Sequence, residues 1–270
     1  MNMQQEIAVY LNYCQYQKKL STLSIKAYSI DLHQFACYLG SLKEQRLTKV
    51  VISNYLQYLH QKYPAKTVKR KLASLRAFLN YLEFEEILDA NPIRKIKTRF
   101  QEPKQLPKTI PLRFIEKLLT VAQNEQKATT TTYSAFVALR NRAMLETLFA
   151  TGARVSELCS LKTSDINIDD GTIRIMGKGA KERIIQIGNS EVIESLRQYQ
   201  EANRCESDFF FINRLATRIS EQSVRFMIRR LCTAAGIPQH ITPHMFRHSF
   251  ATLLLEEDVD IRYIQRMRYV

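Results

Sequence analysis

The sequence has few cysteines, and none of them form a C-x-x-C pair. The five are widely spaced along the chain: Cys14, Cys37, Cys159, Cys205 and Cys232. This pattern argues against a disulfide framework and against a structural zinc site. No apolar run approaches the ~18 residues that a membrane span requires. The opening residues, MNMQQEIAVY, lack the basic-then-apolar order of a secretory signal. We therefore expect a cytoplasmic protein with reduced thiols.

The sequence also lacks the motifs of nucleotide and metal chemistry. The stretch Gly177-Lys178-Gly179 contains glycine, but the G-x-x-x-x-G-K-[ST] spacing of a nucleotide phosphate loop is absent. No carboxylates cluster at the spacing of a two-metal site. We expect neither ATP, GTP nor a metal as cofactor.

Acidic residues are scarce relative to basic ones. The 270 residues include 40 Lys and Arg against 26 Asp and Glu, a formal net charge of +14. Such an excess favours a polyanionic partner, either nucleic acid or an anionic membrane surface. A merely basic soluble protein would have the same composition. Charge alone leaves these alternatives open.

The first hundred residues are expected to form an all-α domain. Four segments carry apolar residues at a period near 3.6, beginning at Ile7, Ile25, Ile52 and Val68. Ser21 and Thr22 suit the cap of the second helix, and Thr48 suits that of the third. Short connections between four helices are typical of a compact helical domain.

A proline-rich, charged stretch follows, and it predicts a domain boundary near residue 105. We assign residues 1–100 to the helical domain, 101–111 to a linker and 112–270 to a second domain. Within the second domain, helices are expected from residue 115, at 136–149, 189–203, 220–235, 243–256 and 260–267. Residues 171–188 alternate in polarity around a glycine-containing turn, which predicts a β-hairpin. Residues 209–212 suit a short strand. The expected fold is mainly α with a small β-hairpin or sheet.

Basic residues gather at the start of the fourth helix. Lys66, Lys69 and Arg70 share one helix face, and Arg76 follows. Such a face can lie along DNA phosphates, or it can be an ordinary solvated helix surface. The first hundred residues also carry more of the net positive charge than the longer remainder.

Three segments of the second domain bear residues suited to phosphate chemistry. In TGARVSEL, Arg154 is expected near a helix start, where a guanidinium and backbone N–H groups favour an anion. Lys178 is expected at the hairpin turn. In TPHMFRH, Thr242 and Pro243 suit a helix start, and this places His244 and Arg247 on one face of the first turn. Each segment alone has an ordinary structural explanation.

Together, these segments resemble the tyrosine-recombinase (phage-integrase) family, most closely its simple Xer-type and integron-type members. The order Arg154, then Lys178 on a hairpin, then His244-x-x-Arg247 matches the family's pattern after a helical core-binding domain. The resemblance implies that Arg154 and Arg247 clamp the scissile phosphate and that His244 assists proton transfer. Lys178 would protonate the departing 5′-oxygen or contact a neighbouring base, and Glu157 would buttress the site.

The resemblance further implies site-specific recombination of double-stranded DNA through a 3′-phosphotyrosyl intermediate, by a homo-oligomer (dimer to tetramer) in the bacterial cytosol or nucleoid. Integration, excision and dimer resolution all remain open. A helical transcription-type DNA binder is disfavoured, because such a protein does not need the set Arg154, Lys178, His244 and Arg247.

The family's pattern is interrupted near the end of this sequence. After Gln265 the chain reads Arg-Met-Arg-Tyr-Val, where a Leu-Gly-His segment and then the nucleophilic tyrosine are expected. The simplest interpretation is a catalytic domain truncated at its C-terminus, and the alternative function is a non-catalytic DNA-binding remnant. A second interpretation is an internal deletion that makes Tyr269 the nucleophile. Tyr263 is better explained by core packing.

Overall fold

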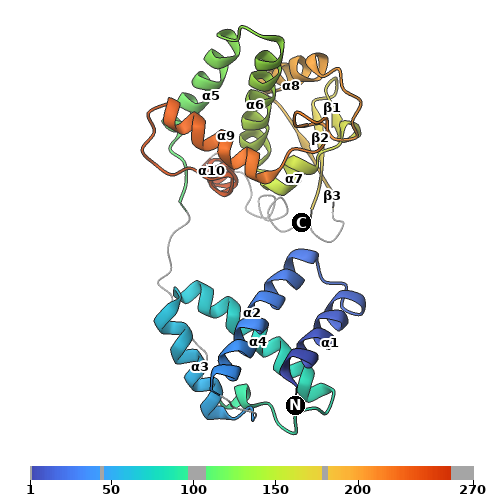
Figure 1. The fold of residues 1–270 in the computed structure, drawn as a ribbon. Helices are drawn as coiled ribbons and strands as arrows, with labels where there is room; N and C mark the ends of the chain where they lie inside the picture. Colours follow the sequence, from blue (N-terminus) through green and yellow to red (C-terminus); the bar gives the residue numbers. More distant parts are fainter. Residues whose placement is uncertain (1, 43–45, 97–107, 178–181, 257–270) are drawn as a thin grey trace. The chain divides into compact units, whose positions relative to one another are not determined.

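A computed structural model of the chain describes residues 2–42, 46–96, 108–177 and 182–256. The backbone divides into two units, Met1–Lys104 and Gln105–Val270 (Figure 1). Each unit has its own apolar core. Ile93 is buried in the first core and Ile110 in the second. The predicted boundary near residue 105 and most of the predicted linker lie outside the described residues, so the assigned domain limits stay a prediction.

The first unit contains the four predicted helices. They are α1 (Met3–Tyr16), α2 (Thr22–Ser41), α3 (Lys49–Lys62) and α4 (Ala65–Phe84), followed by a 3₁₀ turn, η1 (Pro92–Lys95). Two of the predicted caps are confirmed: Ser21 Oγ accepts the Ser24 N–H at 3.3 Å, and Thr48 Oγ1 accepts the Val51 N–H at 3.3 Å. These side chains satisfy backbone donors that the first helical turn leaves unpaired. Thr22, the other candidate for α2, is its first helical residue and not its cap.

The second unit is built around one long helix. Its helices are α5 (Leu112–Lys127), α6 (Thr132–Thr151), α7 (Val155–Ser160), α8 (Ser190–Ala202), α9 (Glu221–Ala234) and α10 (Pro243–Glu256), with the 3₁₀ turn η2 (Thr163–Asp165). Helix α6 packs against α5, α8 and α10 (Figure 1). It begins earlier than predicted because Thr131 and Ser134 form a reciprocal capping box. The predicted helix 260–267 lies outside the described residues.

The predicted hairpin is confirmed, and one additional strand extends it. Strands β2 (Thr172–Met176) and β3 (Glu182–Gln186) pair antiparallel, and the short β1 (Ile166–Asn167) pairs with β2. Successive strand side chains point to opposite faces. One face of the hairpin accordingly buries Ile173, Ile175 and Ile185, and Arg183 shares that buried face.

The expected strand at residues 209–212 was wrong. This stretch makes only isolated bridges, Lys162 with Phe209 and Ile212 with Arg218. Phe210, Phe211 and Ile212 are all buried, whereas a strand on a sheet surface would turn alternate side chains outward. The rings of Phe210 and Phe211 both pack on Tyr199 of α8, so core packing sets the path of this segment. The fold class itself, mainly α with a small sheet, is confirmed.

Candidate active site

The turn that ends α6 gives the candidate site its backbone. Gly152 closes the helix at φ +57°, a left-handed conformation that glycine adopts readily. A Cβ on Gly152 would lie 2.5 Å from Cδ1 of Phe250, so α10 packs directly against the turn. Thr151 Oγ1 accepts the Ala153 N–H at 3.1 Å and donates to the Thr147 carbonyl at 2.6 Å. The path of residues 151–153 is thereby fixed from both sides.

Arg154 follows this turn as the N-cap of α7, which agrees with its predicted place at a helix start. The Glu157 carboxylate accepts the Arg154 backbone N–H at 2.9 Å and its Nη1 at 2.6 Å. The Arg154 side chain stays 36% exposed, whereas that of Glu157 is 5% exposed. Glu157 therefore holds both the backbone and the guanidinium of a partly accessible arginine.

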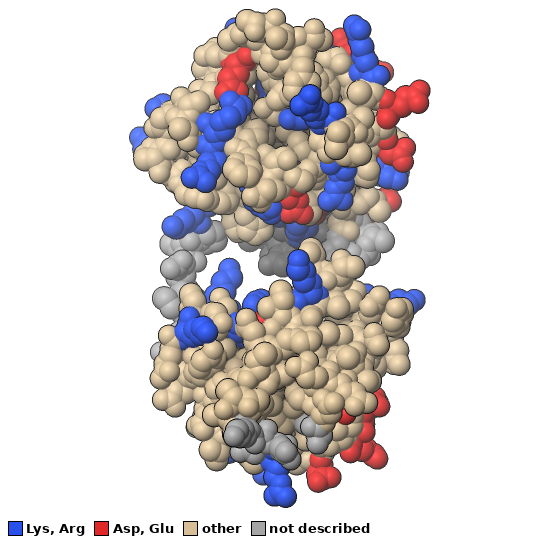
Figure 2. All heavy atoms as spheres, viewed as in Figure 1, with Lys and Arg blue, Asp and Glu red and all other residues tan. Residues whose placement is uncertain are grey.

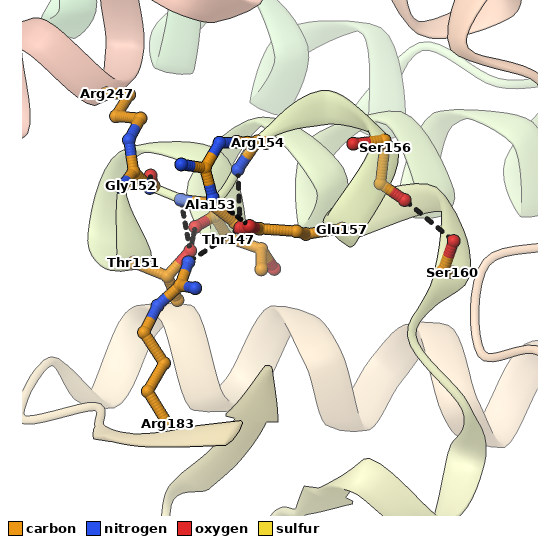
Figure 3. A network of polar contacts seen from close by, with 10 residues as sticks. All are labelled: Thr147, Thr151, Gly152, Ala153, Arg154, Ser156, Glu157, Ser160, Arg183 and Arg247. Atoms are coloured by element: carbon orange, nitrogen blue, oxygen red, sulfur yellow. Dashed lines mark hydrogen bonds and ion pairs between the residues drawn. The ribbon is translucent and has the colours of Figure 1, made fainter. Parts of the chain in front are cut away.

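Arg247 reaches the same turn from α10. Its Nη1 donates to the Gly152 carbonyl at 2.8 Å, and the residue is buried (Figure 3). The structure thus brings Arg154 and Arg247 together at residues 152–154, although they lie far apart in the sequence. His244 lies one turn earlier on α10 and is exposed, with its ring centroid 5.4 Å from that of His248.

Sequence reasoning missed one residue of this network, Arg183. It extends from β3, and its Nη2 donates to Glu157 Oε2 at 2.6 Å (Figure 3). Burial alone would raise the pKa of the Glu157 carboxyl. Hydrogen bonds from Arg183 and from the backbone and side chain of Arg154 outweigh this effect, so that pKa lies below its ordinary value. A charged residue in the inward-facing register of an alternating strand was the available signal.

Three residues discussed from the sequence lie outside the described residues: Lys178, Tyr263 and Tyr269. Their predicted roles stay predictions. Among the residues that the structure describes, no three His, Cys, Asp or Glu side chains group closely enough to hold a metal ion. None of the described helices is long and apolar enough to span a membrane.

The basic residues of α4 lie on its surface, which is compatible with both predicted roles, contact with DNA phosphates and an ordinary solvated helix face. Lys66, Lys69, Arg70 and Arg76 are all exposed. Figure 2 shows Lys and Arg side chains over the upper part of the first unit, and acidic side chains gathered toward its lower end. On the face drawn, most basic side chains of the first unit therefore lie apart from its acidic ones, although one basic side chain lies at the lower end.

A buried carboxylate supports this basic face from inside. Asp31 of α2 is 2% exposed and pairs with Arg70, with Lys71 Nζ at 3.0 Å and with the Ser74 hydroxyl at 2.8 Å. Lys71 belongs to the same basic stretch but is itself buried, and its Nζ lies 4.9 Å from the Tyr63 ring centroid. Arg70 is therefore both a surface cation and the partner of a buried carboxylate, which sequence spacing did not reveal.

Comparison with known proteins places these two units in one family. Residues 110–268 match the model of the phage integrase family, and residues 7–86 match the phage integrase N-terminal SAM-like domain. A tyrosine recombinase of Agathobacter rectalis is 48% identical over 98% of this chain and 88% of its own length. Tyrosine recombinase XerD of Listeria monocytogenes is 35% identical over 96% of this chain and 87% of its own.

A solved structure supports the fold. A lambda integrase dimer bound to a COC′ core site superposes with a TM-score of 0.76 at 17% identity, covering 99% of this chain and 94% of that one. The resemblance noted in the sequence is confirmed by these matches over both units. This chain belongs to the phage integrase family, whose curated relatives are named tyrosine recombinases.

Proposed function

We propose that this chain is a site-specific DNA recombinase that binds duplex DNA and grips one backbone phosphate with Arg154 and Arg247. The proposal rests on one observation: the Arg247 guanidinium donates to the Gly152 carbonyl, and Arg154 follows the same turn as the N-cap of α7. Planar guanidiniums suit the paired oxygens of a phosphate. Family membership and the relatives named tyrosine recombinases support a recombinase function.

The proposed chemistry transfers a phosphoryl group without net hydrolysis. A tyrosine oxygen attacks the phosphorus, the bond to the 5′-oxygen breaks, and a 3′-phosphotyrosyl link and a 5′-hydroxyl result. Arg154 and Arg247 would neutralise the charge that develops on the non-bridging oxygens. His244 would assist proton transfer, and Lys178 would protonate the leaving 5′-oxygen or contact a base beside it. The covalent link conserves the phosphodiester energy for rejoining to a second strand.

DNA binding in this proposal uses the basic face of α4 together with the second unit. Lys66, Lys69, Arg70 and Arg76 would contact phosphates, which position the protein without reading the sequence. The lambda integrase neighbour was solved as a dimer on DNA. We propose that this chain likewise acts as a homo-oligomer, dimer to tetramer, on double-stranded DNA in the bacterial cytosol.

The test begins by selecting a duplex from a random pool with the full chain. Mobility shifts on the selected duplex should weaken with salt at a log–log slope of about −0.9 per phosphate neutralised. A nicked version of the same duplex then traps any covalent product, with Arg154→Ala and Tyr269→Phe as variants. A covalent band that both variants abolish would support cleavage with Tyr269 as the nucleophile.

The other outcomes test DNA binding and DNA cleavage separately. A band that Tyr269→Phe retains and Arg154→Ala loses would support cleavage by another tyrosine. A salt-sensitive shift with no covalent band would support DNA binding and contradict cleavage by this chain. If no duplex is enriched and no shift is seen, the proposed function is wrong.

A further inference from the structure

Arg183 occupies a position where a charge is not expected. It lies on β3 opposite Ile175 of β2, in the register that also buries Ile185. Its side chain is only 7% exposed. A buried guanidinium is unfavourable unless it is paired and hydrogen-bonded. Its presence on the inner face of the hairpin therefore calls for a specific partner, and that partner is Glu157.

Glu157 is shared between two arginines. Its Oε1 accepts Arg154 Nη1 at 2.6 Å, and its Oε2 accepts both the Arg154 backbone N–H at 2.9 Å and Arg183 Nη2 at 2.6 Å. One carboxylate therefore links β3 to the first turn of α7. If Arg183 were removed, Oε2 would keep only the Arg154 backbone donor, and the Glu157 carboxylate would be less firmly fixed. The Arg154 guanidinium, which this carboxylate accepts, would then be less well oriented.

Arg183 is not fully satisfied by Glu157. Two guanidiniums share that one carboxylate, and the guanidinium of Arg247 lies at the neighbouring Gly152 carbonyl. Nε and Nη1 of Arg183 are buried and have no hydrogen-bond partner within the described ranges. Unsatisfied buried donors are unfavourable, and in native proteins they call for an explanation such as a functional site.

We infer that Arg183 is a positioning residue of the phosphate site: through Glu157 it fixes the Arg154 guanidinium, and in this way it strengthens the hold on the bound phosphate. This inference rests on the proposed function. A purely structural role, in which Arg183 only anchors the hairpin, predicts a different result. In that case, substitution of Arg183 would lower stability without changing how the protein discriminates a charged from an uncharged phosphate.

The experiment measures that discrimination at a single phosphate. Ethylation interference on the selected duplex identifies the phosphates that the full chain contacts. Each is then replaced by a neutral methylphosphonate, and the affinity ratio between the charged and the neutral duplex is measured. At the clamped phosphate, wild type should bind the charged duplex about 10- to 100-fold more tightly, since hydrogen bonds to charged groups are lost. A general loss of folding affects both duplexes equally and cancels in the ratio.

Variants of the network should change this ratio, and a matched control should not. Arg183→Gln should reduce it to about threefold or less, and Arg183→Lys, which keeps the charge but not the planar fork, should give an intermediate value. Glu157→Gln should resemble Arg183→Gln, and the double variant should be no worse than either single one, because they act as a unit. Arg174→Gln breaks another arginine–carboxylate pair of the same sheet, to Asp165, and should keep the wild-type ratio.

Each outcome is decisive. A ratio lowered by Arg183→Gln but not by Arg174→Gln supports the inference. A wild-type ratio in folded Arg183→Gln overturns it and leaves the proposed function standing. If wild type shows no preference for a charged phosphate at any contacted position, the phosphate clamp itself is wrong, and the inference is wrong with it.

Discussion

Replacing Gly152 with alanine tests whether the turn after α6 is set by backbone conformation and by close packing against α10. Gly152 has φ +57°, and a side chain there costs about 1–2 kcal/mol in the left-handed region. The new Cβ would also lie 2.5 Å from Cδ1 and 3.0 Å from Cγ of Phe250. Overpacking of this kind costs about 1–3 kcal/mol. The two effects together should lower the free energy of unfolding of the second unit by roughly 2–5 kcal/mol, a large fraction of the ~5–15 kcal/mol typical of a domain.

Gly188 provides the matched control in the same unit. It lacks the left-handed φ, and an added Cβ would meet no atom within 4 Å. Gly188→Ala should therefore be neutral or should stabilise by about 0.4–1 kcal/mol, because alanine restricts the unfolded chain. Calorimetry on the full chain would measure both variants. Hydrogen exchange in peptides from α6 and α10 would assign the change to the second unit.

A double-mutant cycle separates the two contributions. Phe250→Ala removes the ring that the new Cβ would contact, so the loss caused by Gly152→Ala should shrink by about 1–3 kcal/mol in that background. The reasoning fails if Gly152→Ala and Gly188→Ala have the same free energy of unfolding within about 0.5 kcal/mol, a typical error of additivity. It also fails if the cycle shows no coupling between Gly152 and Phe250.

Three further predictions concern charges and thiols. Asp31→Asn leaves the buried Lys71 without its counter-charge and should destabilise the first unit by about 3–5 kcal/mol in denaturant unfolding; a loss under 1 kcal/mol would show that this pair is dispensable. Because the pKa of Glu157 is lowered in the folded state, its ionised form stabilises the protein above the ordinary Glu pKa of about 4.3, and this contribution is lost as pH falls through the lowered value. The stability difference between wild type and Glu157→Gln should therefore be constant near neutrality and shrink in acid, and a difference independent of pH down to pH 2 would contradict the assignment. Burial raises the pKa of the Cys159 thiol to about 11, so at pH 8 a thiol reagent should modify it only on unfolding, while two exposed cysteines react at once: Cys37 and Cys205.

The parts of the fold that the sequence predicted are those set by local interactions. Helical periodicity and caps such as Ser21 and Thr48 involve residues three or four positions apart, and the hairpin alternates over one continuous stretch. The strand expected at residues 209–212 failed for the opposite reason. Its path follows the packing of Phe210 and Phe211 around Tyr199, and no local pattern encodes such packing.

The candidate site shows the same division at the level of side chains. Arg154 and Arg247 were singled out because the order of their short segments, together with Lys178 and His244, resembles the family's pattern. What orients them spans the chain: Arg247 bonds a carbonyl 95 residues away, and Glu157 bonds Arg183 at a separation of 26. Sequence reasoning could therefore name residues that would handle a phosphate, but not the carboxylate-centred network that holds one of them. The hairpin was interpreted as a support for Lys178 alone. In the structure it also places Arg183 beside Glu157, so hydrogen bonds connect the sheet to the α6–α7 turn. A substitution on the inner face of β3 should consequently change the orientation of the Arg154 side chain, whereas one on its outer face, such as at the exposed Ile184, should not.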